Sequence, residues 1–309
     1  MIKVSDLAYV RFRAPDLDRA EAFLTDFGLV RAARTASALY MRGSDAFHHV
    51  HVTELGEPAF VGVGLRAESV ADLEAIARAP GAGPVEPIDE PGGGLRVRLV
   101  DPNGIALEVV HGMEGVSALP LPARRPRNDG ATRARRGEPQ SVERGPSHVK
   151  RLGHFVLLVN DFRETEAFYR DRFGFLSSDE VYLGDRDQVL AAFMRCDRGA
   201  EYVDHHTFLA IGAGQVALNH VSFEVHDLDD LMAGHEHLAA RGHAHHWGVG
   251  RHVVGSQVFD YWRDPWGNVH EHWTDGDLFD ATSPTGAIAI GGPGPESHWG
   301  PPAPSPFGA

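Results

Sequence analysis

The sequence predicts an α+β fold that occurs twice along the chain. The segment LAYVRFRAPDLDRAEAFLTDFGL, which begins at Leu7, resembles LGHFVLLVNDFRETEAFYRDRFGF, which begins at Leu152. Two further pairs of similar segments follow in the same order, so an internal duplication is the simplest explanation. The expected strands alternate polar and apolar residues, and no G-x-G-x-x-G motif separates a strand from a helix. A doubly wound nucleotide-binding fold therefore fits badly.

The first pair of repeats predicts a strand followed by a helix. An alternating or apolar run suits the strand, and Asp16 or Asp161 then stands where a helix cap is expected. The helical pattern ends at Gly28 in one copy and at Gly174 in the other. In the first copy the apolar residues at helical spacing are Leu17, Ala20, Phe23, Leu24 and Phe27.

The other two pairs of repeats complete the module. FVGVGLRAESVADLEAI matches NHVSFEVHDLDDLMAG, and each segment predicts a strand that leads into a helix. LVDPNGIALEVV matches WRDPWGNVHEHW, and each predicts two strands joined by a turn that contains Pro and Gly. Each half is therefore expected to contain two β-α-β-β-β modules.

Composition shifts divide the chain into four parts. The segment between the two halves is rich in Pro, Gly and Arg and shows no helical or strand periodicity, which is typical of a linker. We expect an N-terminal domain at residues 1–120, the linker at 121–147, a second domain at 148–280 and a Gly/Pro-rich tail at 281–309.

The overall composition limits the classes of function. The formal net charge of −14 makes sequence-independent nucleic-acid binding an unfavourable interpretation. No run approaches the roughly 20 apolar residues that span a bilayer, so no membrane partner is expected. The single cysteine, Cys196, cannot form an intramolecular disulfide, and the N-terminus lacks the plan of a secretory signal. These features favour a cytoplasmic location.

Histidines at two repeated positions distinguish the C-terminal half. Most of the 19 histidines follow residue 147. His154 stands in the first strand of the second half, where the N-terminal copy has Tyr9. His220 stands in the strand of the third repeated segment, where the N-terminal copy has Gly62. Because tyrosine and glycine replace both imidazoles, we expect only the C-terminal half to chelate a metal.

A carboxylate completes the candidate metal set. Glu271 lies seven residues after Asp264, as Glu108 lies seven after Asp101, so both halves keep this acid. Two imidazoles and one carboxylate on three strands of one half form a 2-His-1-carboxylate set, whose open positions suit non-haem Fe(II) chemistry with oxygen. A lone histidine at a strand start is more often a surface or core residue, and it is the duplication that favours the metal interpretation.

These motifs resemble the type I extradiol ring-cleaving dioxygenases, the catechol 2,3-dioxygenase group of the vicinal oxygen chelate superfamily. The resemblance covers residues 1–280 and rests on LGH, LNHVSFEV and DPWGNVHEHW, which carry His154, His220 and Glu271. It implies two tandem vicinal-oxygen-chelate domains with a metal site in the C-terminal one. It also implies Fe(II), with Mn(II) as the alternative metal, O₂ as co-substrate, and a homo-oligomer.

The resemblance also implies roles for residues around the metal. DHHTFLAI places His206 near the oxygen site, and His206 is favoured over His205 because neighbours in a strand face opposite sides. Tyr261 lies ten residues before Glu271, and His252 lies nine before Tyr261, as in the family. His252 and Tyr261 are candidates for accepting the first substrate proton, and His206 for stabilising negative charge and then acting as an acid.

The implied reaction is extradiol (meta) cleavage of a small catecholic compound, with a muconic semialdehyde-type product. Two alternatives stay open: a metal-dependent glyoxalase-like isomerase or epimerase, and a non-catalytic protein that binds an aromatic compound. Tyr9 and Gly62 count against the first, because they remove two ligands. The tail at 281–309 is either a lid over the site, as in some relatives, or a disordered terminus.

A further group of histidines is interpreted as surface residues. They lie in a predicted helix and in the predicted RGHAHHWG loop after it, and a solvated surface is favoured over a metal patch. They are His235, His237, His243, His245 and His246.

Overall fold

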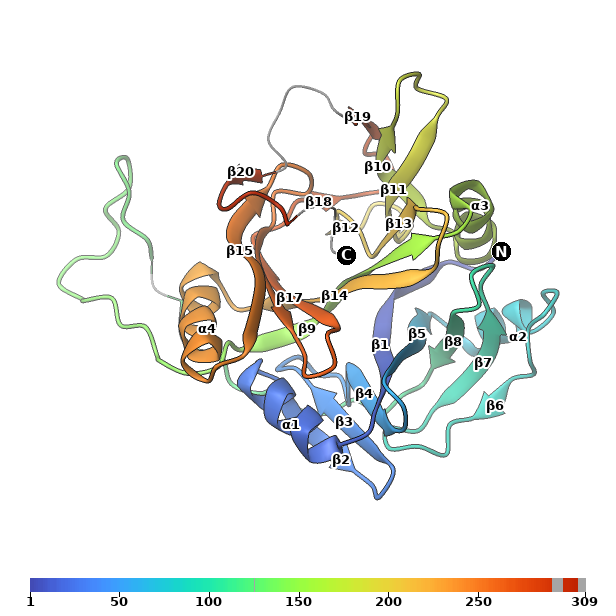
Figure 1. Cartoon of the computed structure of the whole chain (residues 1–309), viewed down its shortest axis with the longest axis horizontal. Helices are drawn as coiled ribbons and strands as arrows, with labels where there is room; N and C mark the ends of the chain where they lie inside the picture. The colour runs from blue at the N-terminus through green and yellow to red at the C-terminus, as the bar shows by residue number, and fades with distance from the viewer. Residues whose placement is uncertain (125, 291–296, 305–309) are drawn as a thin grey trace.

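The computed structural model describes residues 1–124, 126–290 and 297–304 as two large mixed sheets, one in each half of the chain (Figure 1). The N-terminal sheet has eight strands in the order β2-β3-β4-β1-β5-β8-β7-β6. The C-terminal sheet has ten, in the order β19-β10-β11-β13-β9-β14-β17-β16-β15-β20. The predicted α+β fold is therefore confirmed.

The N-terminal half contains two β-α-β-β-β modules, as the repeats predict. The first consists of β1 (Val4–Ala14), α1 (Leu17–Asp26), β2 (Val30–Arg34), β3 (Ala38–Arg42) and β4 (His51–Leu55). The second consists of β5 (Ala59–Ala67), α2 (Val70–Ile76), β6 (Glu86–Pro87), β7 (Leu95–Val100) and β8 (Ala106–His111). The antiparallel pairing of β1 with β5 joins the two modules into one sheet.

The C-terminal half repeats this plan with additions. Its first module is β9 (Val149–Val159), α3 (Phe162–Phe173), β10 (Leu176–Tyr182), β11 (Val189–Arg195), the short β12 (Val203–Asp204) and β13 (Phe208–Gly212). Its second is β14 (Ala217–Val225), α4 (Leu228–Ala240), β15 (Ala244–His252), β16 (Val258–Arg263) and β17 (Val269–Thr274). The additional strands are β18 (Leu278–Phe279), β19 (Gly286–Ala289) and β20 (Ser297–Trp299).

The expected caps set the bounds of the first helix in each half. The side chains of Asp16 and Asp161 accept hydrogen bonds from backbone N–H groups in the first turn of α1 and α3. Gly174 follows α3 with φ of 73°, a left-handed conformation that side chains with a Cβ disfavour. The sequence therefore predicted where these helices start and stop.

The described part of the tail extends the C-terminal sheet at both edges. β19 pairs with β10 in parallel, and β20 pairs with β15 in antiparallel fashion. The interpretation as a disordered terminus is wrong for these segments, because backbone pairing fixes them. Figure 1 shows the sheet curled, so that these two edges approach each other above β9, β14 and β17. The bounds of the four predicted parts and the role of the tail as a lid stay predictions.

The two halves share one apolar core. Phe27, at the end of α1, is fully buried and stacks on His272 of β17 with 3.8 Å between ring centroids. His272 Nε2 also donates to the carbonyl oxygen of Phe27 over 2.6 Å. Side chains from both halves thus hold the N-terminal sheet against the strand that carries Glu271. Within the described ranges, no helix is long and apolar enough to cross a membrane.

Candidate metal centre

Three neighbouring strands bring His154, His220 and Glu271 together. β14 lies between β9 and β17, and Ser222 of β14 pairs with His154 on one side and with Glu271 on the other. Residues that face each other across strands point to the same side of a sheet. His220 lies two residues before Ser222, so its side chain points to that side as well. Strand register is therefore what assembles this candidate set.

The side-chain atoms of the three residues converge on one point. His154 Nε2 lies 3.0 Å from Glu271 Oε2 and 3.3 Å from His220 Nε2. His220 Nε2 lies 3.4 Å from the same carboxylate oxygen. Ligands at about 2.0–2.2 Å from one metal ion are separated by roughly 3 Å, so these spacings suit a shared divalent cation.

Burial and charge make the carboxylate the deciding feature. Glu271 is completely buried, and neither of its oxygens has a hydrogen-bond partner among the described residues. Burial would raise the pKa of Glu271, but the imidazoles of His154, His220 and His252 outweigh it and hold this pKa well below its usual range. Burial lowers the pKa of His154. An ionised carboxylate beside a neutral imidazole has the protonation that a metal requires.

A neighbouring side chain orients one of the imidazoles. His220 Nδ1 lies 2.6 Å from Asn219 Oδ1, an acceptor that places the ring proton on Nδ1 and leaves the lone pair of Nε2 directed at the centre. Sequence reasoning did not single out Asn219, although it directly precedes the histidine in LNHVSFEV.

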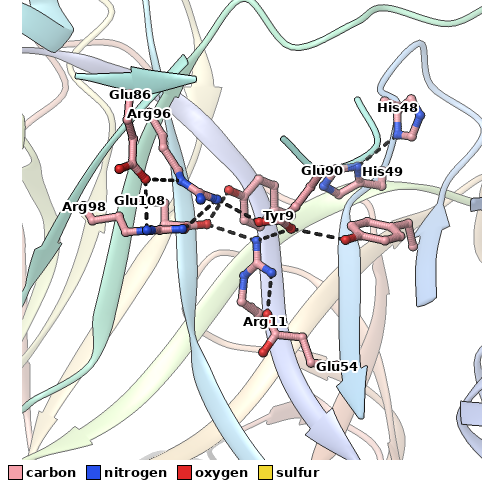
Figure 2. A network of polar contacts seen from close by, with 11 residues as sticks. Tyr9, Arg11, His48, His49, Glu54, Glu86, Glu90, Arg96, Arg98 and Glu108 are labelled. Atoms are coloured by element: carbon pink, nitrogen blue, oxygen red, sulfur yellow. Dashed lines mark hydrogen bonds and ion pairs between the residues drawn. The ribbon is translucent and has the colours of Figure 1, made fainter. Parts of the chain in front are cut away.

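In the N-terminal half, guanidinium groups surround the glutamate that corresponds to Glu271 (Figure 2). Glu108 accepts a hydrogen bond of 2.6 Å from the Tyr9 hydroxyl and contacts the guanidinium groups of Arg11, Arg96 and Arg98. A side chain at Gly62 would meet the carbonyl oxygen of Ala106 at 1.9 Å, so no imidazole can replace this glycine unless the backbone shifts. The repeat thus keeps the acid but satisfies it without a metal.

His206 lies against the candidate centre. Its ring centroid is 4.1 Å from that of His154, and burial, followed by the neighbouring imidazoles of His154 and His205, holds its pKa well below the usual range. His205 Nε2 instead lies 2.7 Å from Asp179 Oδ2. The expected reason for favouring His206 over His205 was wrong, because both histidines lie in the short connection between β12 and β13 and not in a strand. Their Nδ1 atoms lie 3.1 Å apart.

Tyr261 and His252 form a pair beside the same carboxylate. Tyr261 pairs in register with Glu271, and its hydroxyl lies 2.8 Å from His252 Nε2. Burial and the negative charge of Glu271 raise the pKa of Tyr261 well above its usual value. The side chain of His252 is 20% exposed, so this pair connects the buried centre to solvent. The structure thus brings all six candidate residues together, while their roles stay predictions.

The interpretation of the histidine-rich surface needs correction. His245 and His246 lie in β15 and not in a loop, and His235 and His245 both contact the buried carboxylate of Asp260. His237 and His243 contact Asp26 of the N-terminal half. No spacing in the sequence indicates these contacts, because each aspartate belongs to a different element.

Comparisons with known proteins agree with this geometry. The sequence profile of the Glyoxalase/Bleomycin resistance protein/Dioxygenase superfamily matches residues 151–271, which include His154, His220 and Glu271. Metapyrocatechase 2 of Cupriavidus necator is 28% identical over 98% of this chain and 91% of its own length. The likeness to this superfamily thus includes all three residues of the candidate set. The predicted resemblance to its extradiol dioxygenase members is confirmed.

Two solved structures show how well this superfamily fold is kept. Homoprotocatechuate 2,3-dioxygenase from Brevibacterium fuscum has a TM-score of 0.82 at 21% identity, covering 99% of this chain and 92% of its own. A Mn(II)-bound glyoxalase from Novosphingobium aromaticivorans has a TM-score of 0.78 at 26% identity, and the match covers 98% of this chain and 94% of the glyoxalase chain. The likeness in fold thus covers nearly the whole chain and not only the segment that the profile matches.

Glu271→Gln tests the candidate centre. We expect the variant to lose at least tenfold in affinity for a divalent metal, because an amide cannot supply the charge of the buried carboxylate. Metal content after loading with Fe(II) without oxygen and desalting measures the effect. Glu108→Gln, the same change at the repeat counterpart, is expected to keep the metal. Equal metal content in wild type and Glu271→Gln would contradict the assignment.

The buried His49 predicts acid sensitivity in the N-terminal half. Burial, aided by the charges of His48 and Arg11, lowers the pKa of His49 to about 3. The unfolded chain therefore binds this proton below pH 6.5 whereas the folded chain does not, so stability falls as the pH drops from 6.5 towards 3. At pH 5 this amounts to about 2 kcal/mol. His49→Gln should reduce the loss between pH 7 and 5, measured by urea unfolding.

Proposed function

We propose that this chain is a non-haem Fe(II)-dependent dioxygenase that cleaves a catecholic ring beside its two hydroxyl groups. O₂ is the co-substrate, and the product is a muconic semialdehyde-type compound. The observation that carries the proposal is the completely buried carboxylate of Glu271 beside the imidazoles of His154 and His220. Relatives named as metapyrocatechase and biphenyl-2,3-diol dioxygenase support the same reaction class.

His154, His220 and Glu271 would hold the iron on one side and leave the other side open. When bound, Fe(II) supplies the redox-active centre that lets O₂ react with a closed-shell aromatic ring. A single carboxylate suits this role. With Fe²⁺, one Glu⁻ and a singly deprotonated catechol the charges cancel, which a buried site accepts without a large desolvation cost.

Tyr261 and His252 take the first substrate proton in this proposal. Because the pKa of Tyr261 is raised well above its usual value, the phenol stays protonated in the resting protein. It can accept a proton from a catechol hydroxyl only while it donates its own to His252 Nε2, 2.8 Å away. His252 is partly exposed and can release this proton to water.

His206 stabilises the charge that develops later. The depressed pKa keeps its ring neutral, so it can donate a hydrogen bond without adding a second positive charge beside the metal. Its neighbour His205 contacts Asp179 through Nε2 and the His206 ring through Nδ1, and so orients the ring of His206. This proposal also includes the homo-oligomeric state that the family resemblance implies and the cytoplasmic location that the single cysteine and the N-terminus favour.

A glyoxalase-type isomerase is the second candidate, because the likeness to the Mn(II)-bound glyoxalase covers nearly the whole chain. The two candidates differ in their need for oxygen. We would load the protein with Fe(II) without air and then add air-saturated buffer with substrates suggested by its relatives. These are 3-methylcatechol, biphenyl-2,3-diol, 3,4-dihydroxyphenylacetate and 1,2-dihydroxynaphthalene.

The proposal predicts a yellow product and about one O₂ consumed per catechol. Oxygen uptake without colour would contradict extradiol cleavage and favour intradiol cleavage or simple oxidation. Bound iron without oxygen uptake on any member of the panel would favour the isomerase.

Tyr261→Phe tests the proton path. We expect kcat to fall by about 100-fold with iron content unchanged, because phenylalanine cannot pass the proton to His252. Steady-state oxygen uptake across pH 6 to 9 measures the effect, and raising the pH should restore part of the rate by deprotonating the free catechol. Tyr40→Phe, which removes a hydroxyl from the N-terminal half, is the matched control. A kcat within twofold of wild type would contradict the role of Tyr261.

A further inference from the structure

A second group of metal-type donors lies outside the candidate centre. His235 of α4, His245 of β15 and Asp260 of β16 each present one ligand atom, and these atoms lie within 4.8 Å of one another. His245 Nε2 lies 2.9 Å from Asp260 Oδ1, and His235 Nδ1 lies 3.1 Å from Asp260 Oδ2. Three separate elements therefore direct their donors at a common point.

These separations suit a zinc-type ion. Zn(II) binds histidine nitrogen and carboxylate oxygen at about 2.0–2.2 Å, which places tetrahedral ligands roughly 3.3 Å apart. The two distances from imidazole to carboxylate are close to this spacing. The Trp262 indole donates to Asp260 Oδ2 over 2.5 Å and orients the carboxylate, as outer hydrogen bonds do at metal sites.

Asp260 is a buried acid without a permanent cation. It has no exposed surface, and no lysine or arginine contacts it within the part of the chain that the structure describes. Asp26, the centre of the other histidine cluster, pairs with Arg241 as well as with His237 and His243. A guanidinium already supplies the cation at Asp26, whereas Asp260 depends on two imidazoles alone.

The fold itself does not require this acid. Asp260 pairs with His272, the residue after Glu271, and the residue that pairs in the same way with the one after Glu108 is Val97. Val97 is fully buried in the apolar core of the N-terminal half. The module therefore packs well with valine at this position, and the buried carboxylate needs another reason.

We propose that His235, His245 and Asp260 form a second metal site, for a divalent cation of the zinc type. The side chains of His235 and His245 are 27% and 34% exposed, so the ion can enter and water can complete its coordination. The bound ion joins α4 to the β15–β16 hairpin, which also carries His252 and Tyr261. Asp260 points to the opposite face of β16 from Tyr261, so this site is separate from the candidate centre.

Zinc stoichiometry tests the proposal on the full-length protein. Competition with a chromogenic chelator should give two tightly bound equivalents in wild type and one in His245→Gln. His154→Ala should also bind one, because it reports on the candidate centre. The matched control is His243→Gln, which alters the cluster at Asp26 and should keep both equivalents.

The same variants have a readout in stability. In a His154→Ala background, saturating zinc should raise the unfolding midpoint by roughly 5 °C, and His245→Gln should abolish this shift. Because His245 is partly exposed, its glutamine variant should fold; His235→Gln serves if it does not. Two equivalents in His245→Gln, or a single wild-type equivalent that His154→Ala removes, would overturn the second site. If only the candidate centre at His154, His220 and Glu271 fails to bind zinc, the proposal of the second site is unaffected.

Discussion

A carboxylate that is removed from water needs a positive charge beside it, and this requirement distinguishes the two halves of the molecule. Both halves keep a glutamate at the same place in their repeated modules. Glu108 meets three guanidinium groups and a tyrosine hydroxyl (Figure 2), whereas the basic groups that meet Glu271 among the described residues are all imidazoles. The same backbone therefore carries permanent internal cations in one half and a donor set suited to an added cation in the other.

Strand register brings the three candidate ligands of the C-terminal half together. His154 and Glu271 flank Ser222 from either side, and His220 lies two residues away on the same face, so no loop has to position any of the three. The strand that carries Glu271 is in turn fixed by His272, which reaches across to Phe27 of the N-terminal half. This contact gives the N-terminal half a positioning role that requires no metal of its own.

Sequence patterns predicted whatever depends on local order or on the repeat. The caps at Asp16 and Asp161, the βαβββ modules, and the convergence of His154, His220 and Glu271 follow from periodicity and from comparing the two halves. The contacts of His235 and His245 with Asp260 depend on how α4 packs on the sheet, which no repeat reveals. Edge pairing likewise depends on free backbone groups and not on side chains, so the Gly- and Pro-rich tail gave no strand signal at Gly286–Ala289.

Alternation along β16 ties the two candidate metal sites to one structural element. Tyr261 faces the buried glutamate, and its neighbours Asp260 and Trp262 face the opposite side, where the indole of Trp262 and two imidazoles hold the aspartate. A rigid outer face limits how far the backbone of Tyr261 can move, and a proton transfer over 2.8 Å tolerates little movement. The cluster of Asp260, Trp262 and the two imidazoles on the outside of the hairpin is therefore placed to preserve the geometry of Tyr261 and His252 on the inside. This holds whether protonated imidazoles or a metal ion balance the charge of Asp260.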